Sequence, residues 1–180
     1  LLILPSWHAA ETQAGDREAL IIDPGLAFGT GSHPTTRLCL EWLDEHDPRG
    51  LRVIDYGCGS GILAIAAARL GAAEVIGIDI DPQAVLSTAE NARINRVEVI
   101  ALGGDAPLPP PADLVIANIL STPLKLLAPI LSSLVAPGGR LVLSGVLERQ
   151  IDEVASCYDP ALNVQAWRTR DGWACLSGRR

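Results

Sequence analysis

The sequence has no methionine, one phenylalanine and one lysine, Lys125, among its fourteen basic residues. It also lacks any apolar run close to the roughly eighteen residues that a membrane span requires. Its opening "LLILPSWHAA" is apolar for only four residues and has no basic flank, which is not the pattern of a signal peptide. We therefore expect no membrane segment, and the absence of methionine at position 1 leads us to expect a longer chain upstream.

Positive charge is also scarce, because the formal net charge is −7 at pH 7. A surface of this sign repels phosphate backbones, so nucleic acid is a poor candidate partner and a basic protein is a better one. The four cysteines, Cys39, Cys58, Cys157 and Cys175, show no CxxC spacing. We expect them to be reduced thiols of a cytoplasmic protein, with neither a disulfide nor a metal site.

At 180 residues, 48% of them apolar, the chain has the size of one well-buried domain. From residue 51 onward, strand-like and helix-like segments alternate, which indicates parallel strands joined by right-handed crossovers. The expected strands are 51–57, 74–80, 97–105, 113–120 and 140–145, and the expected helices are 60–71, 81–95 and 122–134, the last broken or kinked at Pro129.

The C-terminal segment has a different pattern. Residues 163–170 and 173–180 resemble two strands joined by Asp171-Gly172, a hairpin signal. The fold class predicted is therefore α/β: a Rossmann-like, doubly wound, mostly parallel seven-stranded sheet with an antiparallel C-terminal hairpin.

Residues 1–32 precede this core and have their own pattern. "LLILPSW" and "EALIID" are expected to pair as a short hairpin, followed by a glycine-rich lid loop. An amphipathic helix is then expected over 32–46, with Ser32 or His33 as its cap. Residues 1–180 thus form one predicted domain, with its Rossmann-like core over 33–180.

The stretch "DYGCGSG", residues 55–61, closes a strand and opens a helix, where open α/β sheets bind ligands. A P-loop would need a Lys that is absent, and the dinucleotide fingerprint needs a glycine where Ile62 stands. The remaining pattern, acidic-x-G-x-G-x-G, resembles class I S-adenosylmethionine-dependent methyltransferases. Gly57 and Gly59 would let the backbone approach that cofactor, and Asp55 could help balance its positive charge. A glycine turn that serves only helix–strand packing remains the alternative.

Three polar residues follow later strands. Asp79 ends the second strand, 22 residues after Gly57, where an acidic side chain commonly accepts the ribose hydroxyls. Asp105, after the third strand, is a weaker candidate for the adenine amino group. Asn118 ends the fourth strand and could orient an amine or the cofactor's ammonium group. An aspartate that caps a helix, an ordinary loop aspartate and a structural asparagine are the respective alternatives.

The upstream loop "GLAFGTGSHPTT" is expected to fold over the cofactor as a lid, with Phe28 in contact with the cofactor or the substrate. His33 is interpreted as a helix cap rather than a catalytic residue. No general base can be identified, and the catalytic residues stay unknown. We expect catalysis by proximity, orientation and desolvation.

The stretches "DPGLAFGTGSHPTTRLCLEWL", "VIDYGCGSGILAIAA", "GIDIDPQAV", "VIANIL" and "VAPGGRLVLSG" together resemble the ribosomal protein L11 methyltransferase family. The resemblance implies N-methylation, from S-adenosyl-L-methionine, of lysine side chains and the α-amine of that large-subunit ribosomal protein. The family's cofactor contacts map onto Thr36, Gly57, Asp79 and Asn118. It also implies an upstream recognition domain, which these residues lack.

Three alternatives stay open at this stage. The first is a methyltransferase of the same class that acts on another protein or on a small amine. The second is a nicotinamide-dependent oxidoreductase, against which the early third glycine and the C-terminal hairpin both count. The third is a non-catalytic module that binds the cofactor or the ribosome.

Overall fold

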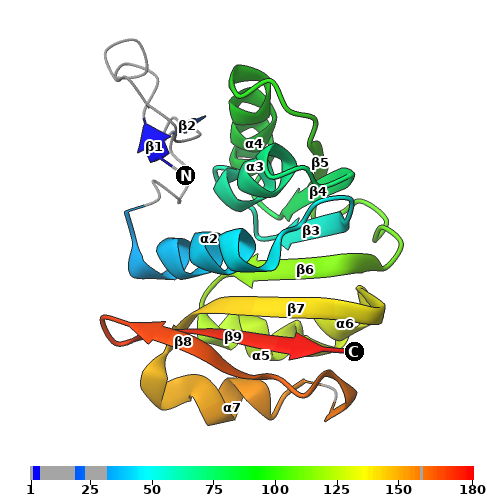
Figure 1. Ribbon diagram of the computed structural model, residues 1–180. Coiled ribbons are helices and arrows are strands. Elements are labelled where there is room, and N and C mark those ends of the chain that lie inside the picture. Colours follow the sequence, from blue (N-terminus) through cyan, green and yellow to red (C-terminus); the bar gives the residue numbers. More distant parts are fainter. Residues whose placement is uncertain (1, 5–18, 23–31, 159) are drawn as a thin grey trace.

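A computed structural model describes residues 2–4, 19–22, 32–158 and 160–180 of the chain (Figure 1). Seven strands form its main sheet, in the spatial order β5-β4-β3-β6-β7-β9-β8. These strands are β3 (Arg52–Tyr56), β4 (Glu74–Asp79), β5 (Ile100–Gly103), β6 (Ala112–Asn118), β7 (Val135–Leu147), β8 (Gln165–Arg170) and β9 (Trp173–Arg179).

The pairing confirms the predicted sheet. Strands β3 to β7 pair in parallel, and β9 is antiparallel to both β7 and β8. The chain builds outward from β3 through β4 to β5, then returns to place β6 on the other side of β3. The strand order therefore reverses between β3 and β6. Open α/β sheets bind ligands beside the carboxyl ends of the strands at such a point, and this edge of β3, β4 and β6 is called the crevice below.

Helices cover both faces of the sheet. Buried side chains of α2 (Pro34–His46), α3 (Ile62–Arg69) and α4 (Pro82–Ile94) share one hydrophobic cluster with β3 and β6, in which Leu38, Leu43 and Ile65 are fully buried. On the other face, α5 (Ser121–Leu126), α6 (Ala128–Ser133) and α7 (Ile151–Ala155) contribute Leu124, Leu131 and Val154 to a second cluster. The two clusters hold the sheet between two helical layers, as doubly wound folds require.

The predicted N-terminal hairpin is wrong. Strands β1 (Leu2–Leu4) and β2 (Ala19–Ile21) pair in parallel, with Ile3 opposite Leu20. A parallel pair needs a connection of about a dozen residues or more, and residues 5–18 supply that length. Asn95, at the end of α4, holds β2 in place. Its Oδ1 accepts from the Ile21 N–H at 2.8 Å and its Nδ2 donates to the Ile21 carbonyl at 2.6 Å.

Other boundaries differ from those expected. The helix expected over 122–134 is two helices, and Leu127 is both the end of α5 and the cap of α6. Pro129 lies in the first turn of α6, where its missing N–H costs no hydrogen bond, so the break falls before it. Strand β5 begins at Ile100 rather than at 97, and β7 runs from Val135 to Leu147, beyond the expected 140–145.

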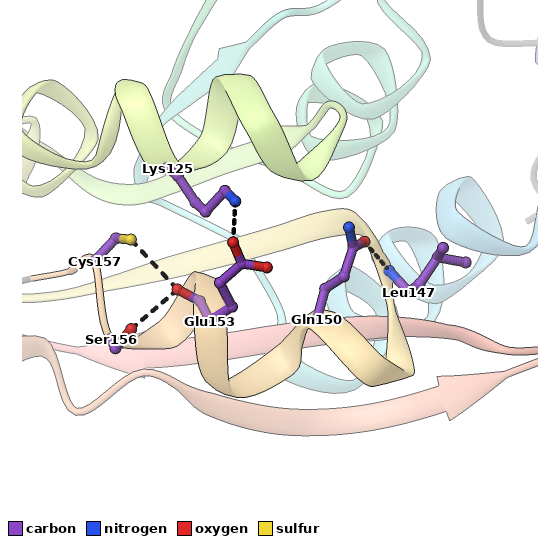
Figure 2. Close-up of polar contacts among 6 residues, drawn as sticks. All are labelled: Lys125, Leu147, Gln150, Glu153, Ser156 and Cys157. Atoms are coloured by element: carbon purple, nitrogen blue, oxygen red, sulfur yellow. Dashed lines mark hydrogen bonds and ion pairs between the residues drawn. The ribbon is translucent and has the colours of Figure 1, made fainter.

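Helix α7, which the sequence patterns did not predict, follows a short 3₁₀ turn at Glu148–Gln150. Figure 2 shows how polar contacts fix it: Lys125 of α5 forms an ion pair with Glu153 of α7. Ser156 Oγ and Cys157 Sγ both donate to the Glu153 carbonyl, at 3.0 and 3.3 Å. A second short 3₁₀ turn, Pro160–Leu162, leads into β8. Within the described ranges, no helix has both the length and the apolar character needed to cross a bilayer.

Candidate active site

The glycine loop after β3 lies at the switch point that the strand order creates. Gly57, Gly59 and Gly61 have positive φ angles of 78°, 56° and 80°, a backbone region that glycine enters without strain. The Gly57 and Cys58 N–H groups both donate to the Ile78 carbonyl, at 2.7 and 3.1 Å. These hydrogen bonds fasten the loop to β4, so the carboxyl ends of β3 and β4 are held together.

Two of these glycines also allow close packing. A Cβ atom on Gly57 would lie 2.4 Å from Ile119 Cγ2, and one on Gly61 would lie 2.9 Å from Thr88 Cγ2. Neither separation is possible for two carbon atoms without a shift of structure. Packing therefore accounts for part of the glycine requirement, beside any approach of a ligand.

Asp55 at the end of β3 is buried, with 1% of its surface exposed. Its Oδ2 accepts a hydrogen bond from the Ala64 N–H of α3 at 3.0 Å, while its buried Oδ1 has no hydrogen-bond partner among the described residues. Burial, and to a smaller degree the negative charge of Asp79, raise the pKa of Asp55 to about 7, against the lowering effect of the Ala64 hydrogen bond. An unpaired buried acceptor of this kind fits a ligand that brings positive charge or a donor.

Asp79, at the end of β4, is half-buried and links two loops. Its Oδ2 accepts from the Gly59 N–H at 2.9 Å and its Oδ1 from the Asp81 N–H at 3.0 Å. Each carboxylate oxygen has a second lone pair, so both can still accept a ligand hydroxyl. Asp81 caps α4 through a 2.9 Å bond from the Gln83 N–H, as expected, and the ribose-binding role of Asp79 stays a prediction.

Asn118 and Thr36 meet across the same edge. Asn118 Nδ2 donates to Thr36 Oγ1 at 3.3 Å, joining the end of β6 to the first turn of α2. His33 caps α2, because its Nδ1 accepts from the Thr35 N–H at 3.4 Å and also bonds to Thr35 Oγ1 at 2.8 Å. The interpretation of His33 as a cap is confirmed.

The predictions for Asp105 and for the lid loop with Phe28 are not tested by the structure. Asp105 lies exposed in the turn after β5, and its part in adenine binding stays a prediction. Phe28 and the rest of the proposed lid, 25–31, lie outside the described residues. Of the described side chains, no group of three or more His, Cys, Asp and Glu residues is arranged to hold a metal ion.

Sequence reasoning missed Ile80, whose side chain is 85% exposed beside Asp79. A Cβ on Gly104 would lie 2.7 Å from Ile80 Cγ2, so this glycine leaves room for the exposed apolar side chain next to the turn after β5. An apolar surface between the β4 and β5 ends suits a flat aromatic base. The available signal was an isoleucine between two aspartates at a strand end.

The chain matches a known family over its full length. The family model of ribosomal protein L11 methyltransferase (PrmA) matches residues 1–180. The ribosomal protein L11 methyltransferase of Bordetella parapertussis is 58% identical over 186 residues, which covers 99% of this chain and 61% of the relative. That of Ralstonia nicotianae is 59% identical over 177 residues, or 98% of this chain and 58% of the relative. The chain thus spans about six-tenths of the length of these relatives.

Solved structures agree with this match. The ribosomal protein L11 methylase of Lactobacillus delbrueckii subsp. bulgaricus has a TM-score of 0.88 at 33% identity, covering 99% of this chain and 94% of its own. A Thermus thermophilus 16S rRNA methyltransferase in complex with AdoMet and guanosine has a TM-score of 0.72 at 24% identity, covering 88% of this chain and 46% of its own, and supports the fold alone. The chain therefore belongs to the ribosomal protein L11 methyltransferase family.

Proposed function

We propose that this chain is the catalytic part of an S-adenosylmethionine-dependent protein N-methyltransferase that acts in the cytoplasm. Its substrate is ribosomal protein L11, on lysine side chains and the α-amine. The observation that carries the proposal is the family match over residues 1–180, which coincides with a glycine loop at the switch point.

The crevice residues fit the cofactor. The Asp55 Oδ1 is a buried acceptor without a partner among the described residues and lies beside the glycine loop, which suits a ligand carrying positive charge. Gly57 and Gly59 would hold the methionine end, together with Thr36 and Asn118. Asp79 would accept the ribose hydroxyls, and Asp105 would bind the adenine amino group. Two solved structures with this fold, each 24% identical to the chain, are complexes with AdoMet and with S-adenosyl-L-homocysteine, so the fold accommodates this cofactor.

When bound, the cofactor would supply an electrophilic methyl group on positively charged sulfur, for transfer to an uncharged amine that loses its proton to solvent. The residues of this chain must orient an uncharged amine about 3–3.5 Å from that methyl group. A lysine with a pKa of about 10.4 costs on the order of 4–5 kcal/mol to deprotonate at neutral pH. The Leu120 side chain is exposed in the free protein, and covering it with the bound substrate would lower this cost, because desolvation favours the neutral amine.

We assign no general base. His33 Nδ1 is bonded to Thr35 at the cap of α2, and the Asp55 carboxyl is buried against α3. Orientation and desolvation therefore carry the proposed catalysis. The net charge of −7 favours a basic protein as the partner.

The test is methyl transfer from tritiated S-adenosylmethionine to purified ribosomal protein L11, with total cell lysate as the competing substrate. We expect label on the ribosomal protein. An Asp79→Asn variant should lose cofactor affinity, while the matched Asp152→Asn variant on exposed α7 should keep it. Label only on other proteins would contradict the substrate, and saturable binding of a reduced nicotinamide nucleotide without any methyl transfer would contradict the reaction.

A further inference from the structure

Ile119 lies between the glycine loop after β3 and strand β7. It follows Asn118 directly at the end of β6, and its half-buried side chain reaches over the glycine loop. A Cβ on Gly57 would lie 2.4 Å from Ile119 Cγ2, and a Cβ on Gly145 of β7 would lie 2.1 Å from the Ile119 carbonyl oxygen. Ile119 is therefore in close contact with a glycine on each side, one after β3 and one in β7.

The glycine at position 145 belongs to an irregularity in the sheet. The pairing of β7 with β9 shifts register between Leu143 and Val146, and Gly145 has a φ of +87°. Such a bulge changes the direction of a strand locally, and bulges are often found beside active sites. Here it brings the β7 backbone close under the segment 118–120.

The glycine loop and the segment 118–120, which meet at Ile119, are also held by hydrogen bonds of their own. The glycine loop has its own hydrogen bonds, from Gly57 and Cys58 to Ile78 and from Gly59 to Asp79. The segment 118–120 is tied by the pairing of Asn118 with Ser144 of β7, by the 3.3 Å bond of Asn118 to Thr36 and by the Leu120 carbonyl, which accepts from the Leu124 N–H at 3.1 Å. Ile119 lies just beyond the last paired residue of β6, where its contacts with the glycine loop and with Gly145 add to these bonds.

We propose that Ile119 is a positioning residue for methyl transfer, which sets the place of Asn118 and Leu120, and so of the incoming amine, relative to the glycine loop. This inference rests on the proposed function, since it assigns Ile119 a task within that reaction. Ile119 acts through its neighbours and does not take part in the chemistry. Its loss should therefore slow transfer and leave cofactor binding largely intact.

The β-branch of Ile119 allows a sharp test, because the contacting atom is Cγ2. Valine keeps this methyl group and removes only the end of the side chain. Leucine keeps the number of carbon atoms and loses the branch, and alanine loses both. A role for the branch contact therefore separates Val from Leu, whereas a role for apolar bulk would favour Leu over Val.

The experiment compares Ile119→Val, Ile119→Leu and Ile119→Ala in the full chain. We expect kcat within about threefold of wild type for Val, and a loss of about tenfold or more for Leu and Ala, since small misplacements of reacting groups cost up to about a hundredfold. Cofactor Kd, measured by calorimetry with S-adenosylhomocysteine, should stay within about threefold in all three. Equal kcat for Leu and wild type, or a cofactor Kd that weakens in step with kcat, would overturn the proposal.

Substitution of Gly145 gives a second, independent test of the contact with Ile119. Gly145→Ala should push the Ile119 carbonyl away and lower kcat as Ile119→Ala does. Gly138→Ala is the matched control, because Gly138 lies in the same strand with a φ of +78° and has nothing within 4 Å of its Cβ position. If both alanine variants lose kcat equally, backbone strain and not contact with Ile119 is responsible, and the proposal fails.

Failure of the proposed function can be told apart from failure of this inference. If the wild-type protein transfers no methyl group to ribosomal protein L11, the proposed function fails. Hydrogen–deuterium exchange at the Leu124 amide then tests the positioning alone. Faster exchange in Ile119→Leu and Ile119→Ala, and not in Ile119→Val, supports it, whereas unchanged exchange in all three contradicts it.

Discussion

Asp55 is a buried carboxyl group whose hydrogen bonding is incomplete in the free protein. The side chain has one oxygen hydrogen-bonded and one without a partner in the described part of the chain. Because burial raises its pKa to about 7, the free protein at neutral pH holds a mixture of protonated and ionised carboxyl. A cation in the crevice would draw this equilibrium toward the ionised form.

The raised pKa of Asp55 predicts a pH dependence of stability. From about pH 4 to about pH 7 the folded protein keeps a proton that the unfolded chain has lost, so the free energy of unfolding falls as pH rises through this window. An Asp55→Asn variant lacks this fall. Urea unfolding should therefore show the variant gaining stability relative to wild type between about pH 4 and about pH 7. A constant difference between variant and wild type across this window would contradict a raised pKa of Asp55 in the folded protein.

Gly57 and Gly50 form a matched pair for a second prediction. Both have positive φ, 78° and 75°, but a Cβ on Gly57 meets Ile119 whereas a Cβ on Gly50 meets nothing within 4 Å. Gly57→Ala should cost about 1–3 kcal/mol more stability than Gly50→Ala, because the clash adds overpacking to the backbone strain. Denaturant midpoints of the two variants measure this. Equal midpoints would mean that the loop moves away from Ile119 freely.

At the scale of elements, α2 connects the crevice to the C-terminal hairpin. Its first turn carries Thr36, which bonds Asn118, and its later turns carry Glu41 and Glu45. Arg168 on β8 bonds Glu41 at 3.3 Å and Glu45 at 3.0 Å, and Arg170 bonds Glu41 at 2.8 Å. The first turn of α2 therefore fixes the position of Thr36, while ion pairs with the antiparallel hairpin hold the later turns of the helix.

The contribution of the His33 cap to α2 can be tested by substitution. His33→Ala removes the acceptor for the Thr35 N–H and should cost about 1 kcal/mol of stability. His33→Asp restores an acceptor of the preferred kind, so thermal unfolding should return close to that of wild type. Methyl transfer by His33→Asp should match the wild-type kcat. A loss of kcat in this variant, with unchanged cofactor affinity, would make His33 a catalytic residue and contradict the interpretation.

Elements fixed by interactions between residues close in the sequence were predicted, and those fixed by contacts between distant residues were not. The crossovers of the parallel sheet and the C-terminal hairpin leave local patterns of apolar residues and turn residues, and both were confirmed. The parallel pairing of β1 with β2 leaves none, because it depends on Asn95, more than seventy positions along the chain from Ile21. Helix α7 was missed because it is five residues long and is fixed by a contact with Lys125 on α5.

For the whole molecule, the excess of acidic residues is the property that reaches beyond the crevice. Some of the described cations form ion pairs within the molecule, as Arg168 and Arg170 do with α2 and Lys125 does with α7. The net charge of −7 should therefore attract a basic substrate at long range. Such attraction acts on the association rate and is screened within about 8–10 Å at physiological salt.

This charge predicts a salt dependence that separates substrate from cofactor. The KM for ribosomal protein L11 should rise about tenfold or more between low and high salt, because steering between opposite charges falls steeply with ionic strength. The Kd for S-adenosylhomocysteine should change little, since its contacts lie within the crevice. Steady-state kinetics and calorimetry over the same salt series measure the two. Equal salt responses would argue against an electrostatically steered protein substrate.

Sequence patterns alone were enough to predict the alternation of strands and helices in the parallel sheet, the C-terminal hairpin, the glycine loop and the polar residues that end β4 and β6. These features follow from local periodicity and turn chemistry, which a linear chain carries in full. Tertiary structure alone decided that Ile119 lies against Gly57 and Gly145, that Asp55 keeps an unpaired oxygen, and that Asn95 holds β2. Packing and burial depend on which distant segments come into contact, and neither is encoded in the spacing of residues along the chain.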